Sequence, residues 1–307
     1  MRLTIVIVTW NSAGQIKACL ESLHSLQLEH EIWVVDNASS DNTSEIVKSN
    51  FPEVKLLINR ENLGFARANN QVISDSSSDL LLILNPDTIV PEGAIETAVR
   101  ELESRPNAGI LGVKLLNSDL SLQPSCYRFP SPWVNFLEQL GFYRLMPSRQ
   151  RQEVFLSAFW DHAGSRSVDW IMGAFMLVRR SAIDAAGPIP EAYFMYAEDL
   201  DWCFQIRRSG FEVWFTDKAA VMHAGNESAG QLPSRWGVEK RFDSKYIFCR
   251  RAYGPFQSKL IELTDLVAQT IRLPLYRIKA KRDDSIQPVV ERMEIARASA
   301  SRAFLGI

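Results

Sequence analysis

The sequence lacks the features that mark several classes of protein. Its four cysteines are scattered and form no Cys-x-x-Cys pair, so we expect neither a disulfide framework nor a zinc knuckle, and a reducing compartment fits. No stretch holds the roughly 18 apolar residues of a membrane-spanning helix, and the N-terminus has no signal-peptide core. The net charge of −2 gives no general affinity for nucleic acid. We therefore expect a cytoplasmic protein, either soluble or peripheral on the inner face of the cytoplasmic membrane.

The residues that are present fit one large α/β domain with an appendage, or two domains. The chain has 307 residues, of which 46% are hydrophobic and 23% charged. Apolar runs typical of buried strands alternate with segments of helical periodicity. The predicted strands are residues 3–8, 32–35, 54–58, 80–84 and 109–113, and the predicted helices include residues 15–26 and 92–103. This alternation predicts a largely parallel sheet flanked by helices.

The strand predicted at residues 80–84 consists of five aliphatic residues, which indicates burial on both faces. Pro86 ends it, because proline has no N–H for the ladder. Asp87 therefore emerges at the carboxyl end of a central strand, where open α/β sheets bind ligands. Asn85-Pro86-Asp87 is also ordinary turn chemistry. This motif alone does not distinguish a binding site from a turn.

Two other predicted strands also end in polar residues, Thr9 and Asn11 after the first and Asp36 and Asn37 after the second. In a parallel sheet these ends lie along one edge, so the side chains should converge. Neither the Gly-x-Gly-x-x-Gly fingerprint nor a Walker phosphate loop follows the first strand. A nucleotide bound at this edge must therefore be held in another way.

Four segments together resemble the ordered motifs of inverting family 2 glycosyltransferases, most closely the bacterial rhamnosyltransferase-like branch. They are Val8-Thr9-Trp10-Asn11, Val34-Val35-Asp36-Asn37-Ala38-Ser39-Ser40-Asp41, Asn62-Leu63-Gly64-Phe65-Ala66 and Leu84-Asn85-Pro86-Asp87. The resemblance covers roughly residues 3–225. It implies a GT-A fold, an α/β architecture with a mostly parallel central sheet flanked by helices, here followed by a helical C-terminal extension.

The resemblance also implies a donor that is a uridine or thymidine diphosphate sugar, with dTDP-rhamnose the leading choice. Asp36 matches the position that accepts a hydrogen bond from the pyrimidine N–H. Uracil and thymine offer one N–H between two carbonyls, whereas cytosine has no donor there. The donor-binding residues implied in this way are Thr9, Trp10, Asn11, Asp36, Asn37, Asn62, Gly64, Phe65, Asn69, Asn85 and Asp87.

Asp87 is expected to need a divalent cation, Mg²⁺ or Mn²⁺, because it would lie beside a diphosphate. Two like unit charges ~4 Å apart repel by ~4 kcal/mol at an effective dielectric of ~20, and a cation between them reverses the sign. By the resemblance, His223 is the second metal ligand, although a lone histidine is more often structural. Asn85 supplies a neutral amide where the stricter family pattern has a carboxylate, so we expect modest metal affinity.

Two later segments match the acceptor side of the family. Residues 168–178 look like its Trp-x-x-Gly-Ala segment, which borders the donor sugar and the acceptor. Here the matching residues are Trp170, Gly173 and Ala174, which the resemblance assigns to acceptor binding. The two small residues would let a sugar ring approach the backbone. Trp170 would either stack on a sugar or fill the core.

The segment Glu198-Asp199-Leu200-Asp201-Trp202 is the strongest match in the second half. It implies that Asp199 is the general base and that Glu198 orients the acceptor, while Asp201 supports the loop. Capping of a helix predicted at residues 198–208 would explain these acids without any catalytic role. A sugar hydroxyl is too weak an acid to ionise at neutral pH, and a positioned carboxylate contributes roughly 10²–10⁴-fold in rate. We find no candidate nucleophile for a covalent intermediate, which fits inversion.

We expect a catalytic domain over residues 1–225, with a nucleotide-sugar half at about residues 1–113 and an acceptor half at about residues 114–225. Residues 226–307 are predicted to form a basic, amphipathic helical extension. This pattern indicates contact with an anionic membrane surface, where lipid-linked acceptors reside. Helices packed on the catalytic domain explain it equally well. Self-association into a homo-oligomer is left open.

The combined prediction is a metal-dependent inverting glycosyltransferase. It would move a sugar, rhamnose by preference, to a glycan or lipid-linked saccharide in bacterial envelope polysaccharide synthesis. One alternative is a catalytically silent scaffold that binds a nucleotide sugar in a glycan-assembly complex. The other is a sugar nucleotidyltransferase, which needs a Gly-rich loop bearing Lys or Arg after the first strand. Residues 10–14 lack that charge.

Overall fold

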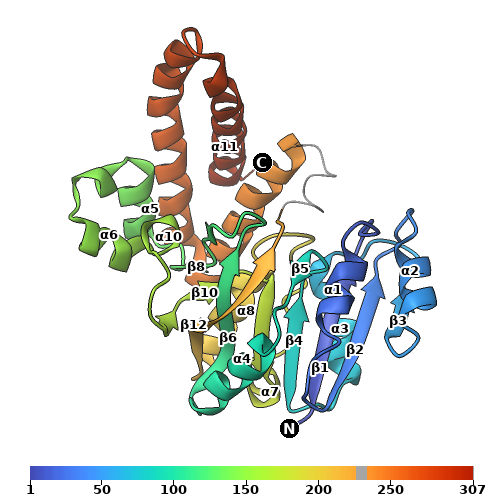
Figure 1. Cartoon of the computed structure of the whole chain (residues 1–307). Helices are drawn as coiled ribbons and strands as arrows, with labels where there is room; N and C mark the ends of the chain where they lie inside the picture. The colour runs from blue at the N-terminus through green and yellow to red at the C-terminus, as the bar shows by residue number, and fades with distance from the viewer. Residues whose placement is uncertain (226–233, 307) are drawn as a thin grey trace. The chain divides into compact units, whose positions relative to one another are not determined.

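A computed structural model describes residues 1–225 and 234–306 of the chain, which divide into two compact units (Figure 1). We call the first the sheet unit; its described residues are 1–128, 156–194 and 198–225. The second, the helical unit, comprises residues 129–155, 195–197 and 234–306.

The sheet unit is built on one mixed sheet with the strand order β3-β2-β1-β4-β11-β6-β12-β5. These strands are β1 (Leu3–Thr9), β2 (His30–Asp36), β3 (Lys55–Ile58), β4 (Leu80–Leu84), β5 (Thr88–Ile89), β6 (Ala108–Leu116), β11 (Phe175–Arg179) and β12 (Glu212–His223). Strands β1 to β4 run parallel, as do β6 and β12, whereas β11 runs antiparallel between β4 and β6. The mostly parallel GT-A-type sheet is confirmed, and β11 is a reversed strand that the pattern of residues 3–113 did not predict.

Four short strands complete the unit. They are β7 (Leu122–Gln123), β8 (Cys126–Tyr127), β9 (Arg166–Val168) and β10 (Trp170–Ile171), with the short 3₁₀ helix η2 (Ser157–Phe159) before β9. Strand β7 pairs with β6 and β9 with β12, while β8 and β10 form a separate two-stranded sheet.

The carboxyl ends of the central strands lie level with one another. Thr9 of β1 is in register with Asp36 of β2, and Ile7 of β1 with Leu84 of β4. All five residues of β4 are buried, as expected for a strand covered on both faces. The polar residues that follow these strands therefore share one edge of the sheet, which confirms the convergence predicted from the sequence.

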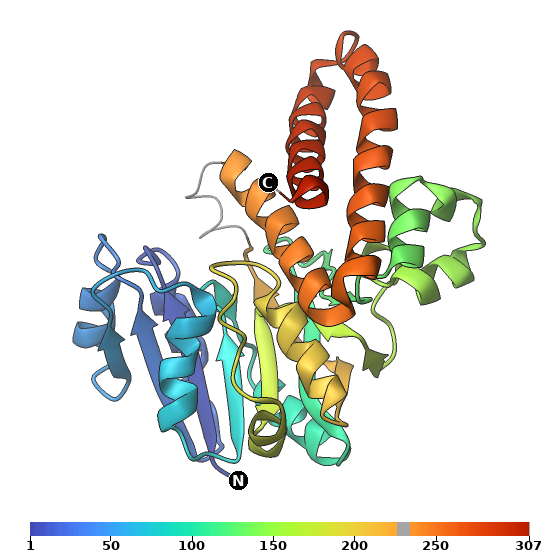
Figure 2. The same ribbon diagram turned by 180° about the vertical axis from the view of Figure 1, so that it is seen from behind.

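Helices cover both faces of the sheet. Figures 1 and 2 show α1 (Ile16–Ser22) and α4 (Ala94–Glu103) on one face, and α3 (Phe65–Asp75), α7 (Arg180–Ala186) and α8 (Glu198–Arg208) on the other. Helix α2 (Thr43–Asn50) follows β2. Helix α4 buries its apolar residues at helical spacing, namely Ala94, Ile95, Ala98, Val99 and Leu102. Helix α8 begins with three acids and ends with two arginines, in accord with the helix dipole.

The helical unit contains α5 (Pro132–Gln139), η1 (Phe142–Leu145), α6 (Ser148–Phe155), α10 (Ser234–Ala280), η3 (Asp284–Ile286) and α11 (Gln287–Leu305). Helix α10 bends at Gly254, whose φ of 78° is not helical and which precedes Pro255. After the bend its second limb pairs with α11 as a hairpin (Figures 1 and 2). None of the helices in residues 1–225 and 234–306 is both long and apolar enough to cross a bilayer.

Buried ion pairs hold the helical unit together. Asp265 is completely buried and lies 2.7 Å from the Lys245 ammonium, and Glu262 lies 3.0 Å from the Arg250 guanidinium. Asn135 of α5 donates to Asp265 at 3.0 Å. Residues 129–155 therefore group with the C-terminal helices, rather than with the acceptor half that we expected at about residues 114–225. Their irregular sequence gave no signal for this packing.

Candidate active site

The nucleotide side of the predicted site lies where β1 and β2 end. The Asp36 carboxylate is buried, and its Oδ1 accepts hydrogen bonds from the Ser39 amide and hydroxyl at 3.0 and 2.5 Å. Its Oδ2 accepts one from the Ser44 hydroxyl. Because a carboxylate oxygen has two lone pairs, Oδ2 is the atom left for the N–H of a ligand. The sequence pointed to Asp36 but not to the two serines that orient it.

Asn11 joins the loops that follow β1 and β2. The side-chain Oδ1 of Asn11 accepts a hydrogen bond from the Ser40 backbone amide at 2.8 Å. The backbone amide of Asn11 donates to the Ser39 hydroxyl at 2.9 Å. Asn11 has a φ of 50°, a conformation that asparagine tolerates better than most residues. Trp10 next to it is half-buried. Hydrogen bonds therefore connect the loop after β1 with the loop after β2, so the two loops are not independent turns.

Asn37 links this edge to the loop before α3. Its Nδ2 donates to the Gly64 carbonyl at 3.1 Å, and the Asn62 side chain accepts from the Gly64 amide at 2.9 Å. Gly64 has a φ of 80°, and a Cβ there would lie 2.5 Å from the Phe194 carbonyl oxygen. The Phe65 amide donates to that same carbonyl at 3.4 Å. Only glycine allows this close approach, so Gly64 positions the 193–194 segment against the donor side.

Three of the predicted site residues carry a buried oxygen that has no hydrogen-bond partner among the described residues. They are Oγ1 of Thr9, Oδ1 of Asn69 and Oε2 of Glu198. The Asn69 amide nitrogen is satisfied, because it donates to the Phe65 carbonyl at 2.9 Å. Buried polar atoms in native proteins are normally paired. Such orphans at predicted ligand positions are what a bound sugar nucleotide and acceptor would satisfy.

Asp87, Asn85 and His223 come together after β4 and β12. The His223 Nε2 lies 3.3 Å from Asp87 Oδ1 and 3.1 Å from Asn85 Nδ2. Its Nδ1 lies 2.6 Å from Gln123 Oε1. The Gln123 amide nitrogen donates to Asn117 and to the His223 carbonyl, at 2.9 and 3.3 Å, which fixes the orientation of that amide. Nδ1 therefore carries a proton, and Nε2 is the ring nitrogen that faces both Asp87 Oδ1 and Asn85 Nδ2.

This arrangement fits a divalent cation. An imidazole lone pair and a carboxylate oxygen that face each other need a proton or a metal ion between them, and a hydrogen-bonded Nδ1–H is typical of metal-bound histidine. The Asp87 Oδ2 accepts from the Gly225 amide at 3.1 Å, which holds the carboxylate in place. Within residues 1–225 and 234–306, no group of three or more His, Cys, Asp or Glu side chains forms a metal site. Two protein ligands leave the other positions to phosphate and water, as Mg²⁺ prefers.

The acceptor side centres on Asp199, at the start of α8. Its Oδ2 accepts a hydrogen bond from the Gly173 amide at 3.0 Å and its Oδ1 one from the Leu200 amide at 2.8 Å. Burial raises the pKa of Asp199 to about 6. Burial, and then the neighbouring Asp199 charge, raise the pKa of Glu198 to about 8. Of the two carboxyl groups, Asp199 is therefore the one that ionises more readily.

One short backbone segment connects the two halves of the site. Gly173 binds Asp199, and the carbonyl of the next residue, Ala174, accepts the Asn85 amide hydrogen at 3.1 Å. A Cβ on Gly173 would lie 3.6 Å from the tip of the Phe65 ring and 3.6 Å from Asp199 Cβ. Gly173 and Ala174 therefore connect Asp199 with the donor-side residues Phe65 and Asn85. The structure brings together residues that are over 100 positions apart in sequence.

Comparison with known proteins identifies this arrangement. The family model described as Glycosyl transferase family 2 matches residues 4–169, more than half of the chain. The chain belongs to this family.

Among its relatives is the N-acetylglucosaminyl-diphospho-decaprenol L-rhamnosyltransferase of Mycobacterium tuberculosis, 29% identical over 80% of this chain and 83% of that protein. Rhamnosyltransferase WbbL of Escherichia coli is 27% identical over 78% of this chain and 90% of its own length. The chain is thus a rhamnosyltransferase-like family 2 glycosyltransferase.

Solved structures place the fold in the GT-A class. The mannosyltransferase PcManGT of Pyrobaculum calidifontis, in complex with GDP-Man and Mn²⁺, superposes with a TM-score of 0.58 at 17% identity, covering 99% of this chain and 87% of that one. Residues 1–349 of TarS of S. aureus, in complex with UDP, superpose with a TM-score of 0.54 at 14% identity, covering 100% and 92%.

The structure also gives the surroundings of Trp170 and Asp201, whose roles were stated as expectations above. Trp170 stacks on the Tyr127 ring at 4.3 Å, and its indole N–H donates to the Arg128 carbonyl at 3.1 Å, so one ring face is already covered. Asp201 accepts a hydrogen bond from the Tyr193 hydroxyl at 2.9 Å, which confirms its predicted part in supporting the loop. Sequence reasoning missed Gln123, since a lone glutamine in an irregular segment carries no motif.

Proposed function

We propose that the chain is a metal-dependent inverting rhamnosyltransferase that uses dTDP-rhamnose and a lipid-linked saccharide acceptor in bacterial envelope polysaccharide synthesis. The observation that carries the proposal is the link between the Asp87–His223 pair and Asp199 through Gly173 and Ala174. It is supported by the activities for which the Mycobacterium tuberculosis and Escherichia coli relatives are named. The remaining lone pair on Asp36 Oδ2 supports a donor whose base offers an N–H, such as thymine or uracil.

On the donor side, Asp87 and the Nε2 of His223 would hold Mg²⁺ or Mn²⁺. That cation, when bound, would neutralise the diphosphate and stabilise the charge of the departing nucleoside diphosphate. Gln123 accepts the Nδ1–H of His223 and so orients the ring with Nε2 toward Asp87. Support for divalent metal use comes from the Mn²⁺ in the PcManGT complex.

On the acceptor side, Asp199 takes the proton of the acceptor hydroxyl as its oxygen attacks the anomeric carbon. The bond from that carbon to the diphosphate oxygen breaks, and its electron pair leaves with dTDP. Attack and departure occur on opposite faces, so the configuration inverts. Protonated Glu198 keeps a second negative charge away from the base and offers an O–H to the acceptor, because burial raises its pKa to about 8.

The second limb of α10 supports contact with a membrane surface. Its exposed apolar side chains recur every three or four residues and are between 38% and 75% exposed: Phe256, Leu260, Leu263, Val267, Ile271, Leu275 and Ile278. The only carboxylates of residues 256–282, Glu262 and Asp265, are buried, so every exposed charge of this stretch is a cation. An apolar helix face bordered by cations fits the cytoplasmic surface of an anionic bilayer.

A donor panel tests the proposal directly. Release of nucleoside diphosphate is measured for dTDP-, UDP- and GDP-linked sugars with a polyprenyl-diphosphate saccharide as acceptor, with and without Mg²⁺ or Mn²⁺. We expect dTDP-rhamnose to stand out and chelation to abolish release. Donor binding without transfer to any acceptor would favour the silent scaffold instead. A GDP-sugar preference would remove Asp36 from base recognition.

A further inference from the structure

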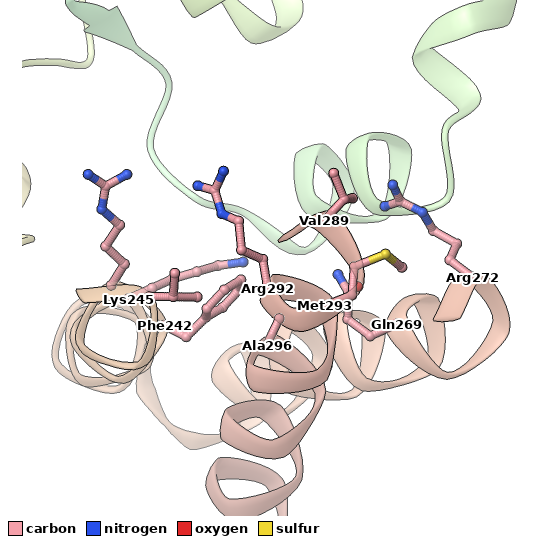
Figure 3. Close-up of a pocket in the computed structure, with 10 residues that line it drawn as sticks. Phe242, Lys245, Gln269, Arg272, Val289, Arg292, Met293 and Ala296 are labelled. Carbon is pink, nitrogen blue, oxygen red and sulfur yellow. The ribbon is translucent and has the colours of Figure 1, made fainter. Parts of the chain in front are cut away.

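The helical unit contains a pocket of about 430 Å³ that none of the catalytic residues lines (Figure 3). Both limbs of α10 and the start of α11 form it. Its lining residues are Val238, Arg241, Phe242, Lys245, Gln269, Arg272, Val289, Arg292, Met293 and Ala296. Four of these are cationic and none is acidic, which sets the pocket apart from an ordinary packing gap.

One of the four cations is neutralised inside the unit. The Lys245 ammonium lies 2.7 Å from Asp265 and donates to Asn135 at 2.7 Å. Burial opposes its charge, but Asp265 raises the pKa of Lys245 above its ordinary value. The charge of Lys245 is therefore neutralised within the helical unit by Asp265.

The three arginines are not neutralised in this way, although the Glu138 carboxyl group lies close enough to Arg272 to interact with it electrostatically. Neutral groups fix two of them: the Arg241 guanidinium lies 4.8 Å from the Tyr196 ring centre, and Arg272 donates to the Gln139 carbonyl at 3.3 Å. No carboxylate in the described part of the chain forms an ion pair with Arg241, Arg272 or Arg292. Figure 3 shows Arg272 and Arg292 extending from α10 and α11 in the same general direction, with the Arg272 guanidinium beside the backbone of α5. Cations gathered in this way repel one another unless an anion joins them.

The rest of the lining is apolar or unsatisfied. Val238, Phe242, Val289, Met293 and Ala296 supply hydrocarbon surface. Gln269 is buried, and its Oε1 has no hydrogen-bond partner within residues 1–225 and 234–306. A small inorganic anion would use the arginines and leave this apolar wall in water. An anion attached to a hydrocarbon chain would use both.

We propose that this pocket binds the phosphate ester of a lipid, and that its occupant is the diphosphate and first isoprene units of the lipid-linked acceptor. Guanidinium groups recognise phosphate oxygens through paired, charge-assisted hydrogen bonds. The assignment of the acceptor rests on the function proposed above. The proposed binding of a diphosphate ester with a hydrocarbon tail does not depend on that function.

Farnesyl diphosphate is the probe, titrated calorimetrically into the full chain below its micelle concentration. EDTA and saturating dTDP are present, so that the donor site cannot account for the binding. We expect binding that is tighter than that of inorganic pyrophosphate. Arg292→Gln should weaken it about tenfold, the value of one charge-assisted contact. Arg297→Gln, an exposed arginine on the same helix outside the pocket, is the matched control and should bind like the parent chain.

Each alternative outcome is decisive. Equal affinity for pyrophosphate would show that the apolar wall is not used and would overturn the proposal. Unchanged binding in both Arg292→Gln and Arg241→Gln would overturn it as well. If phosphatidylglycerol vesicles displaced farnesyl diphosphate, the pocket would be a phospholipid headgroup site and the acceptor assignment would fail. These measurements need no turnover, so failure of the sugar-transfer assay would count against the proposed function alone.

Discussion

Asp199 is half-buried and its carboxylate accepts hydrogen bonds from two backbone amides, a setting that suits a base. Replacing it with asparagine keeps an oxygen for the Gly173 amide but removes the proton acceptor. We expect Asp199→Asn to lower kcat by roughly 10²–10⁴-fold with donor affinity retained. The measurements are nucleoside diphosphate release and a donor binding isotherm, with exposed Asp184→Asn as the control. A normal rate in the variant would exclude Asp199 as the base.

The pH profile should carry the signature of the Glu198–Asp199 pair. Because the pKa of Asp199 is raised to about 6, kcat/KM should rise as pH increases through about 6, where the base becomes ionised. It should fall again near pH 8, where Glu198, whose pKa is raised to about 8, loses its proton. Glu198→Gln should remove the falling limb and leave the rising one. A profile that is flat from pH 5 to 9 would contradict both assignments.

Gln123 is expected to act on the metal through His223. Gln123→Leu removes the acceptor of the Nδ1–H bond, so the ring loses its fixed tautomer. We expect the Mg²⁺ or Mn²⁺ concentration for half-maximal rate to rise about 10–100-fold, as for other partners of metal ligands. Gln27→Leu, at an exposed glutamine that contacts neither His223 nor Asp87, serves as the control. If His223→Ala also left the metal titration unchanged, neither residue would belong to the metal site.

At the level of elements, the loop before α3 depends on Gly64. Gly64→Ala forces a side chain into a φ of 80° and places its Cβ 2.5 Å from the Phe194 carbonyl oxygen. We expect the free energy of unfolding to drop by about 1–3 kcal/mol and donor affinity to fall, as measured by urea unfolding and binding isotherms. Gly210→Ala separates the two causes, since Gly210 has a φ of 93° but open space around it. Equal losses in the two variants would show that the close approach to Phe194 does not matter.

Elements with a simple pattern were predictable from the sequence. Strand β4 and helix α8 match their predicted bounds. A run of five aliphatic residues predicts a buried strand, and acids at the start with arginines at the end predict a helix. Helix α1 ends at Ser22 and not at the predicted residue 26. The chain forms turns over residues 23–26, although the apolar spacing continues there. The reversed β11 was not predictable, because strand direction depends on neighbours and leaves no trace in composition.

The site was predictable only in part, for a related physical reason. Motif residues such as Asp36, Asp87 and Asp199 carry the chemistry and are recognisable one by one. Gln123 and Phe194 act through a side-chain amide and a backbone carbonyl, whose use depends on what the fold places beside them. Residue type alone does not reveal such contacts.

For the whole molecule, the exposed face of α10 predicts a measurable affinity for vesicles. Ile271→Asp combined with Leu275→Asp places two carboxylates on residues that are each 57% exposed. We expect at least a tenfold loss of binding to phosphatidylglycerol vesicles in a flotation assay, since both apolar burial and charge attraction decrease. Leu120→Asp, 64% exposed in the sheet unit, is the control. Retained vesicle binding, or a change in oligomeric state instead, would assign the face to another partner.

Charge is divided unevenly along this chain. Residues 234–306 carry 15 Lys or Arg against 8 Asp or Glu, a net +7, whereas the whole chain has a net charge of −2, so the remainder has −9. At the proposed anionic membrane surface, residues 234–306 would be attracted and the remainder of the chain repelled. Rising ionic strength would weaken both effects. The distribution of cations along the sequence would therefore decide which part of the chain meets the lipid first.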